Sequence, residues 1–413
     1  VNQVVISKAA TSTGSPSLTY ADQTSNLGAS RNALGNLVFN GGVLQFNGVS
    51  SYTDRSFTIN SDAYWDVGNS STVLTVGGNF GTSGVEDVYS LVKRGEGVLD
   101  FRGTFISGYG LERLVVEDGV LRLAPAFGDQ YVRNDFGGLT IAGGTLDIQS
   151  VEGRSTTQNM PGAFRPLEGA STIVATATNN NNTILNLQDI NSPVQVTYSK
   201  ASTIHFVENQ SLTGSGDARI TLAGRFGVDV QTILSRTTYS TNTDFQQPGV
   251  NNFGFVDGTF YDVIGSDSGA AAHTIQGDLA NWTGTMNVQD GALSIDAFQG
   301  ATSSGASVNT IRFFNSSYVS NAPGTSLVSI TDVLVVNAGG ILQTTHAGNH
   351  VNRIEGGSLT TGLINTDGST ADLIIHNWNP VRALEIASVV ADNGSLARKL
   401  NLVLTGNGTT AIS

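Results

Sequence analysis

The most constraining feature of this 413-residue chain is a short phrase that recurs along it. Each copy is an apolar strand, a corner of small residues with glycine, and a second apolar strand. The copies lie at residues 37–46, 91–101, 114–123, 139–148, 286–295 and 334–342. Recurrence of one supersecondary unit is typical of solenoids, in which each turn packs only on its neighbours. The repeat therefore predicts an all-β solenoid of the parallel β-helix type, with irregular loop excursions.

Apolar and polar residues alternate within short segments, as in half-buried strands, and helical periodicity is hard to find. The predicted strands are 43–46, 98–101, 121–123, 146–148, 184–187, 220–222, 293–295 and 402–404. In a parallel β-helix, equivalent side chains stack inward from turn to turn. One leucine position should recur in this way, and its members are Leu44, Leu99, Leu121, Leu146, Leu293 and Leu342.

Hairpins are the alternative reading of the same phrase. Asn40-Gly41, Asp118-Gly119 and Asp290-Gly291 are dipeptides that favour tight hairpin turns. However, both arms carry the same pattern each time, and the phrase returns after spacers of variable length. This recurrence favours the solenoid over a sandwich or barrel of hairpins.

Regularity of the repeat suggests four regions along the chain. Residues 1–33 are predicted to be an N-terminal cap or lead-in segment, and residues 34–150 to be β-helix repeats. Residues 151–275 are less regular, and we expect the β-helix to continue there with longer loops, an inserted domain being the alternative. Residues 276–413 are predicted to be β-helix repeats that end within a repeat, so that another part of a longer protein or a neighbouring copy would continue the pattern.

The composition of the chain argues against several classes of binding partner and of chemistry. Only 13% of the residues are charged, and the net charge is −13 without any basic cluster, which argues against binding to nucleic acid or to an anionic membrane. No run of about 18 apolar residues is present, so we expect no membrane insertion in this chain. There is no cysteine, which excludes disulfides and thiol nucleophiles. Uncharged Asn, Thr and Ser side chains are expected to stack in ladders along the axis.

Metal sites are not predicted. His346 and His350 have the spacing of helical metal ligands, but Ala-Gly-Asn between them favours a turn. Asp262, Asp267 and Asp278 lie in glycine-bearing turns without the repeat that calcium-binding solenoids show. We interpret them as solvated carboxylates and expect no cofactor.

Catalytic residues are not predicted either. Asp100, Arg102, Arg122 and Asp147 fall near equivalent repeat positions, outward on strands. They could line a catalytic face with alternating charge, but cross-strand charge pairing explains them equally well. We therefore expect the chain not to be an enzyme.

Aromatic side chains are the candidate ligand contacts, because they could stack on sugars at the surface. The candidates are Tyr64, Trp65, Tyr109, Tyr131, Trp282 and Trp378. The competing interpretation is stacking within the core or at its ends. The asparagine run 179–182 is expected to form a loop, because consecutive side chains of a strand would point in opposite directions.

The phrases at 91–123 resemble a known repeat. Leu91-Val-Lys-Arg-Gly-Glu-Gly-Val-Leu-Asp-Phe101, followed by Leu114-Val-Val-Glu-Asp-Gly-Val-Leu-Arg-Leu123, is similar to the passenger-associated β-strand repeat of autotransporters. Residues 277–295 and 402–412 look like the same family, and these segments cover about a third of the chain. The resemblance implies a large right-handed β-helix at the bacterial cell surface. The membrane barrel of that family is not among these residues.

Two functions follow as expectations. The first is an extracellular structural or adhesive protein, a rigid rod used as a stalk, surface layer or filament subunit. Its partners would be copies of itself end to end, a host surface or a glycan. The alternative is a glycan-binding or polysaccharide-degrading β-helix protein, of the tailspike or lyase kind, which needs carboxylates and aromatics gathered on one face.

Overall fold

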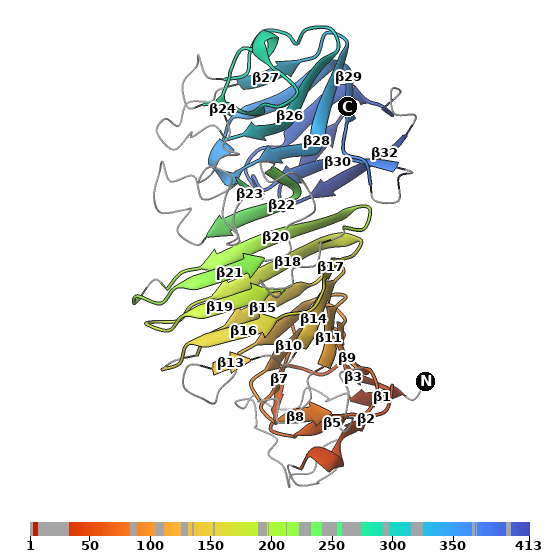
Figure 1. Ribbon diagram of the computed structural model, residues 1–413, viewed down its shortest axis with the longest axis vertical. Helices are drawn as coiled ribbons and strands as arrows, with labels where there is room; N and C mark the ends of the chain where they lie inside the picture. The colour runs from red at the N-terminus through yellow and green to blue at the C-terminus, as the bar shows by residue number, and fades with distance from the viewer. Residues whose placement is uncertain are drawn as a thin grey trace. The chain divides into compact units, whose positions relative to one another are not determined.

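The chain is all-β, and the described strands pair in parallel apart from one antiparallel pair. The computed structural model describes residues 3–6, 33–82, 89–103, 111–124, 131–133, 136–151, 153–188, 196, 198–211, 213–222, 233–241, 254–257, 274–291, 297–314, 325–365, 368, 370–393 and 398–413 (Figure 1). These residues contain strands and short 3-10 turns but no α-helix. They fold as two compact units: unit 1 comprises residues 1–196 and 206–227, and unit 2 comprises residues 197–205 and 228–413.

Unit 1 is built from several parallel sheets. One contains β1 (Gln3–Ile6), β3 (Val43–Phe46), β6 (Ala63–Val67), β9 (Ser90–Arg94), β11 (Leu111–Val116), β14 (Phe136–Ile141) and β17 (Phe164–Pro166). Another contains β4 (Ser51–Thr53), β7 (Val73–Val76), β10 (Val98–Phe101), β12 (Val120–Leu123), β15 (Thr145–Gln149), β18 (Gly169–Thr176) and β20 (Ser202–Asn209), whose first four residues belong to unit 2.

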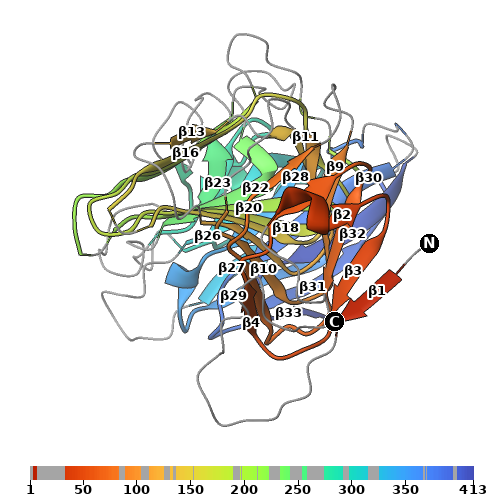
Figure 2. The ribbon, with the colours of Figure 1, turned by 90° about the horizontal axis from the view of Figure 1, so that it is seen from below.

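Two smaller sheets complete unit 1. They contain β13 (Tyr131–Arg133), β16 (Thr156–Met160), β19 (Thr183–Leu187) and β21 (Ala218–Leu222), and β2 (Val38–Phe39), β5 (Phe57–Ile59) and β8 (Phe80–Thr82), with a 3-10 turn at Leu34–Asn36. Figure 2, seen from below the view of Figure 1, shows β13 and β16 on a different side of unit 1 from β3 and β9. The inner faces of three sheets meet in a shared core, because the rings of Phe39, Phe57 and Phe101 pack around Trp65. Phe80 stacks on Phe57 and Phe101.

The order of strands excludes the hairpin alternative at Asp118-Gly119. β11 pairs with β9 and β14, whereas β12 pairs with β10 and β15, so the two arms of the phrase lie in different sheets. Gly119 has φ of +60°, a backbone conformation that suits glycine at such a corner. The corner therefore carries the chain from one sheet to the next instead of folding it back.

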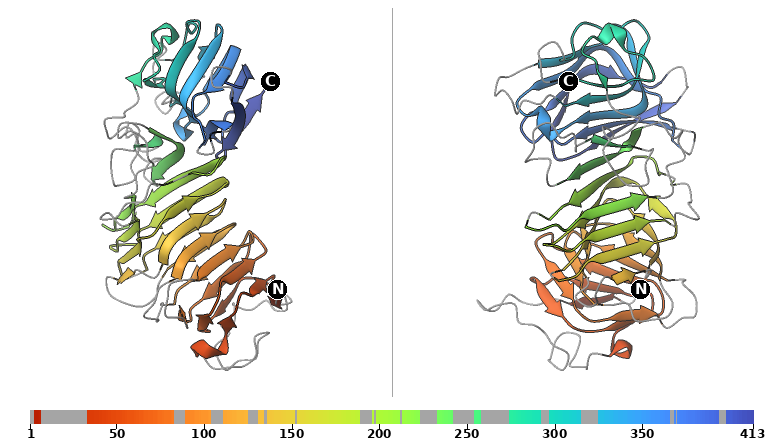
Figure 3. Two further views of the ribbon diagram at one scale, coloured as in Figure 1. Left: turned by 45° about the vertical axis from the view of Figure 1, so that its right-hand side comes forward. Right: turned by 60° about the vertical axis from the view of Figure 1, so that its left-hand side comes forward.

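Unit 2 contains one large sheet and a shorter strand pair (Figure 3). The large sheet contains β24 (Thr274–Ile275), β25 (Asn287–Gln289), β26 (Ala306–Phe313), β27 (Thr325–Ser329), β28 (Val333–Gln343), β29 (Val351–Thr361), β30 (Thr370–Asn377), β31 (Leu384–Val390), β32 (Lys399–Thr405) and β33 (Thr410–Ile412). β22 (Ile233–Thr241) and β23 (Gly254–Asp257) form an antiparallel pair, and 3-10 turns lie at Leu279–Asn281 and Thr345–Ala347.

The strand predictions are confirmed wherever the structure describes them. Residues 43–46, 98–101, 121–123, 146–148, 184–187, 220–222 and 402–404 all lie in strands, while 293–295 and Leu293 fall outside the described residues. The predicted stack of leucines is confirmed for three members: Leu99 pairs with Leu121, which pairs with Leu146. None of these three side chains is exposed to solvent.

Two members of the predicted stack were assigned wrongly. Leu44 is buried but lies in β3, where it pairs with Trp65 in a different sheet from Leu99. Leu342 is buried on the opposite face of its strand from the core, because its neighbour Ile341 occupies the core position. A shift by one residue moves a side chain to the other face of a sheet, and the glycines before Leu342 hide which residue points inward.

Polar ladders are present, as the composition predicts. On β16, β19 and β21 of unit 1, the amide of Asn186 donates to Asn159 at 2.7 Å, and the hydroxyl of Thr221 donates to Asn186 at 2.7 Å. Within the asparagine run 179–182, Asn179 and Asn180 form a tight turn between the paired residues Thr178 and Asn181. The loop prediction for this run is therefore confirmed.

Candidate functional site

The predicted aromatic contacts are dispersed, and two of them are buried. Trp65 is 2% exposed within the aromatic core of unit 1, and Trp282 is 7% exposed in unit 2, where it packs edge-on against Phe298 at 5.2 Å. A side chain buried in this way cannot stack on a surface sugar. Tyr131 lies in β13, where only the backbone is described, and Tyr109 falls outside the described residues.

Tyr64 and Trp378 are partly accessible, yet both have ring partners. The guanidinium of Arg94 lies 4.4 Å from the centre of the Tyr64 ring and is paired with Glu117 at 2.5 Å. The Trp378 ring lies 4.1 Å from that of His205. Tyr64 is in unit 1 and Trp378 in unit 2, so the sequence prediction gathers no single aromatic platform.

The predicted carboxylates form a column of cross-strand pairs in unit 1. Asp100, Arg122 and Asp147 occupy paired positions on β10, β12 and β15. Arg122 donates to Oδ2 of Asp147 at 2.9 Å, and Arg102 donates to Oδ2 of Asp100 at 2.9 Å. This arrangement is the charge pairing that the sequence allowed as an explanation.

The exposure of these carboxylates differs from the expectation. Asp100 is 1% exposed and Asp147 is 7% exposed, because the neighbouring side chains cover them. Burial raises the pKa of Asp147, while the hydrogen bond from Arg122 lowers it by a smaller amount. The Oδ1 atoms of Asp100 and Asp147 are buried without a hydrogen-bond partner. A substrate would have to displace the arginines to reach either carboxylate.

The candidate metal ligands do not converge. Thr345–Ala347 forms a 3-10 turn that ends at Gly348 with φ of +50°, so His346 and His350 lie on a turn, as predicted. Asp278 caps the turn Leu279–Asn281 by accepting from the N–H of Ala280, and Asp262 and Asp267 fall outside the described residues. Among the residues that the structure describes, no group of three or more His, Cys, Asp or Glu side chains could hold a metal.

Sequence reasoning missed the most concentrated polar site, which lies within unit 2. Residues 198–205 and β22, here called the strap, lie against the outer face of β28, β30 and β32. On β30, Asp372, Ile374 and His376 point to this face, whereas Leu373 and Ile375 point into the hydrophobic core. All five side chains are buried, so β30 is covered on both faces.

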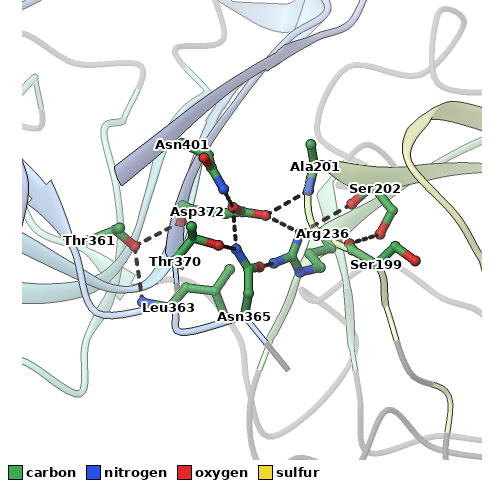
Figure 4. Close-up of polar contacts among 10 residues, drawn as sticks. All are labelled: Ser199, Ala201, Ser202, Arg236, Thr361, Leu363, Asn365, Thr370, Asp372 and Asn401. Atoms are coloured by element: carbon green, nitrogen blue, oxygen red, sulfur yellow. Dashed lines mark hydrogen bonds and ion pairs between the residues drawn. The ribbon is translucent and has the colours of Figure 1, made fainter. Parts of the chain in front are cut away.

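Asp372 is the centre of the first cluster under the strap (Figure 4). It pairs with Arg236 of β22 at 2.7 Å and accepts hydrogen bonds from Asn365 at 2.7 Å, from Asn401 at 2.9 Å and from the backbone N–H of Ala201 at 3.0 Å. Arg236 also donates to Asn365. Burial raises the pKa of Asp372, but Arg236 and these hydrogen bonds together hold it below its ordinary value. The carboxylate therefore stays ionised and joins the strap to β30.

His205 is the centre of the second cluster. Its Nδ1 lies 2.7 Å from the hydroxyl of Thr238, and its Nε2 lies 3.0 Å from the hydroxyl of Ser240. Burial, with a smaller effect of His376, lowers the pKa of His205 to about 3. A Ser–His pair resembles part of a hydrolytic triad, but a histidine with this pKa is a poor base near neutral pH. The hydrogen bonds of His205 therefore join the two segments of the strap to each other.

A sequence signal for this site existed in β30. Its run Leu-Ile-Ile at 373–375 is continuous apolar sequence, which is typical of a strand buried on both faces. Asp372 and His376 flank that run on one face. The partners Arg236 and His205 lie more than a hundred residues earlier, where the repeat is irregular, so no spacing connects them.

Comparison with known proteins gives a distant relative. Over 320 residues, 75% of this chain, the sequence is 27% identical to the adhesin BmaC autotransporter of Brucella suis biovar 1 (strain 1330). The chain is similar to an autotransporter adhesin. It spans only 8% of the length of that relative. No family model and no solved structure matches the chain. Among the described residues, no helix is long and apolar enough to cross a membrane.

Proposed function

We propose that this chain is a right-handed parallel β-helix that serves as a structural or adhesive part of an extracellular bacterial surface protein. The observation that carries the proposal is the in-register parallel pairing of successive strands in unit 1, with buried apolar columns such as Leu99, Leu121 and Leu146. The similarity to an autotransporter adhesin over most of the chain supports the same assignment. A backbone ladder of this kind is stiff without disulfides or metals.

The proposed role does not involve catalysis. The carboxylates that a glycosidase or lyase would use are paired with arginines and covered, as at Arg122 and Asp147. In the Ser240–His205 pair, the low pKa of His205 makes this histidine a poor proton acceptor near neutral pH. These two observations favour adhesion or support over polysaccharide cleavage.

The proposed partners are copies of the chain placed end to end, a host surface, or a glycan. Self-association rests on the parallel ladder, because an unpaired strand of such a sheet accepts another strand in the same register. Binding to a host surface or glycan rests on the name of the relative and on the uncharged polar ladders of unit 1.

The test uses the purified chain immobilised on beads, with bovine serum albumin on matched beads as control. The beads are presented to cultured animal cells, to extracellular-matrix proteins and to a glycan array, and released reducing or unsaturated sugars are measured in parallel. An adhesive protein binds one of these surfaces without releasing sugar. Release of sugar would overturn the non-enzymatic role. Failure to bind any of these surfaces would exclude the adhesive role. Electron microscopy of the purified chain would then show whether it forms rods or filaments.

A further inference from the structure

The Asn40-Gly41 corner of unit 1 combines a reactive dipeptide with an open local structure. It carries the chain from β2 to β3, which lie in different sheets, so it is not a hairpin turn. Asn40 and Gly41 are both exposed. Among the described residues, neither of them has a hydrogen-bond partner. The dipeptide is therefore held only by the strands on either side of it.

Two Asn-Gly pairs of unit 2 are restrained by hydrogen bonds. The side chain of Asn393 is buried and donates to the carbonyl group of Thr361 at 2.7 Å. Gly408, which follows Asn407, donates its N–H to the carbonyl group of Asn377 at 2.8 Å. Each pair must break one of these bonds before its side chain and the next main-chain nitrogen can react.

The fourth Asn-Gly pair of the sequence, Asn47-Gly48 in unit 1, is intermediate. Asn47 is exposed, but Gly48 is buried, and its carbonyl group accepts a hydrogen bond from the hydroxyl of Thr72 at 2.9 Å. Asn40-Gly41 is therefore the least restrained of the four pairs.

We propose that Asn40-Gly41 is a site of spontaneous deamidation, at which the corner changes to isoaspartate and aspartate as the protein ages. The main-chain nitrogen of Gly41 attacks Cγ of Asn40 and passes its proton through water to the side-chain nitrogen. A bond forms between Cγ and the main-chain nitrogen, and the bond from Cγ to the side-chain nitrogen breaks, so that ammonia leaves. Water then opens the cyclic imide at either carbonyl group and leaves one new carboxylate. The reaction consumes one water and needs no enzyme, oxidant or metal.

The corner supplies what this attack requires. The main-chain nitrogen of Gly41 has no hydrogen bond to give up, and glycine has no side chain to shield it. The side chain of Asn40 is exposed and unpaired, so it can rotate until Cγ meets that nitrogen. Isoaspartate adds one main-chain atom to a corner whose flanking residues, Phe39 and Leu44, are buried. Both products add one negative charge.

Incubation of the full chain in water enriched in heavy oxygen tests the proposal, at neutral and at mildly alkaline pH. Mass spectrometry of peptides detects heavy oxygen in each new carboxylate, so only conversion during the incubation is counted. The reference is the chain unfolded in urea, in which all four pairs should react at similar rates. In the folded chain Asn40 should keep most of its unfolded rate, and alkaline pH should raise it. Asn407 should slow roughly fivefold, as expected for one hydrogen bond, and the buried Asn393 should slow further.

The matched variant is Asn40→Gln, which keeps an amide but must close a larger ring that forms more slowly. It should lose the heavy oxygen at residue 40 and keep the wild-type rates at Asn47 and Asn407. An isoaspartyl methyltransferase should label aged wild type more than the aged variant. The proposal is overturned if folding slows Asn40 as much as Asn393, or if heavy oxygen enters the folded chain first at Asn407. Equal methylation of aged wild type and aged Asn40→Gln would also overturn it.

Discussion

Lys93 is a charged side chain buried in unit 1 at a position that the two neighbouring strands fill with apolar residues. Lys93 is fully buried between Trp65 and Val116 of the neighbouring strands. Its ammonium donates to the carbonyl groups of Arg94 at 2.7 Å, Gly95 at 2.6 Å and Asp118 at 3.2 Å. The corner of the chain thus receives its hydrogen bonds from a lysine that reaches it from inside the core.

Burial lowers the pKa of Lys93 to about 8, against the opposite influence of Asp118 and Asp66. The unfolded chain keeps this proton up to about pH 10.4, so between pH 8 and pH 10.4 the unfolded state binds more protons and stability rises with pH. Over that range, the free energy of unfolding of wild type should gain up to about 3 kcal/mol relative to Lys93→Met. Denaturant unfolding monitored by the fluorescence of the adjacent Trp65 measures this difference.

The matched control is Lys200→Met, because Lys200 is exposed. It should follow the wild-type dependence on pH. Parallel curves for wild type and Lys93→Met across this range would show that Lys93 keeps an ordinary pKa in the folded chain.

Loss of Arg122, which lies between Asp100 and Asp147, should lower the free energy of unfolding more than loss of Arg94. Arg122→Ala leaves Asp147 buried without its ion pair, and we expect a loss of roughly 2–4 kcal/mol in the free energy of unfolding. Arg94→Ala removes an ion pair with Glu117 whose side chains are 41% and 39% exposed, so it should cost below about 1 kcal/mol. Equal costs for the two variants in urea unfolding would contradict the burial of Asp147.

The face and the sheet that each side chain occupies were harder to predict from the sequence than the strands themselves. Leu99, Leu121 and Leu146 were placed correctly because each sits at the same point of an unbroken phrase. Leu44 was placed on the correct face but in the wrong sheet, because alternation does not say which sheet a strand joins. Leu342 was placed on the wrong face, because Gly339 and Gly340 shortly before it interrupt the alternation. Asp100 and Asp147 alternate like surface residues, and nothing in the sequence shows that their neighbours cover them.

At the scale of single elements, the corners of unit 1 depend on a column of left-handed glycines. Gly95, Gly119, Gly143 and Gly169 follow β9, β11, β14 and β17 and have φ values of +72°, +60°, +94° and +123°. A Cβ atom on Gly119 would lie 2.3 Å from the carbonyl oxygen of Gly95 in the corner before it. A Cβ atom on Gly143 would meet nothing nearer than 3.8 Å. The same backbone conformation is thus crowded at one corner and open at the other.

This contrast gives a matched pair of substitutions. Gly143→Ala should cost about 1 kcal/mol, the strain of a left-handed alanine. Gly119→Ala adds a clash with backbone that cannot move without disturbing Gly95, so it should cost roughly 2–4 kcal/mol. Thermal unfolding of both variants compares them. A Gly119 variant no less stable than the Gly143 variant would show that the corners are not stacked closely.

The elements themselves were largely predictable, and the strap was not. Short segments with strict alternation became strands at the expected positions, because one of their faces is buried and the other is not. β20 and β22 differ, since residues such as His205, Arg236 and Thr238 are polar and buried at once. Arg236 is paired with Asp372 of β30, and His205 and Thr238 are hydrogen-bonded to each other. A hydropathy pattern carries no record of such bonds.

At the scale of the whole molecule, the two units have separate cores. Unit 1 is centred on the aromatic cluster around Trp65, and unit 2 on an aliphatic cluster that includes Val288, Ile311, Ile341 and Ile375. Units with independent cores should unfold in separate transitions. Fluorescence of Trp65 alone, in a variant with Trp282→Phe and Trp378→Phe, should therefore give a different midpoint in urea from that of Trp65→Phe, in which the tryptophans of unit 2 report. Coincident midpoints in both variants would indicate a single cooperative unit.

The number of residues between paired strands varies along the chain, and this variation bears on how such a chain evolves. Paired residues are 23 apart at Gln289 and Arg312, 25 apart at Arg122 and Asp147, and 35 apart at Asn186 and Thr221. The ladder requires that strands meet in register and places no demand on the residues between them. Insertions and deletions can therefore accumulate in the connections while every inward column is preserved. Related chains can therefore differ in their connecting segments and still inherit the same scaffold.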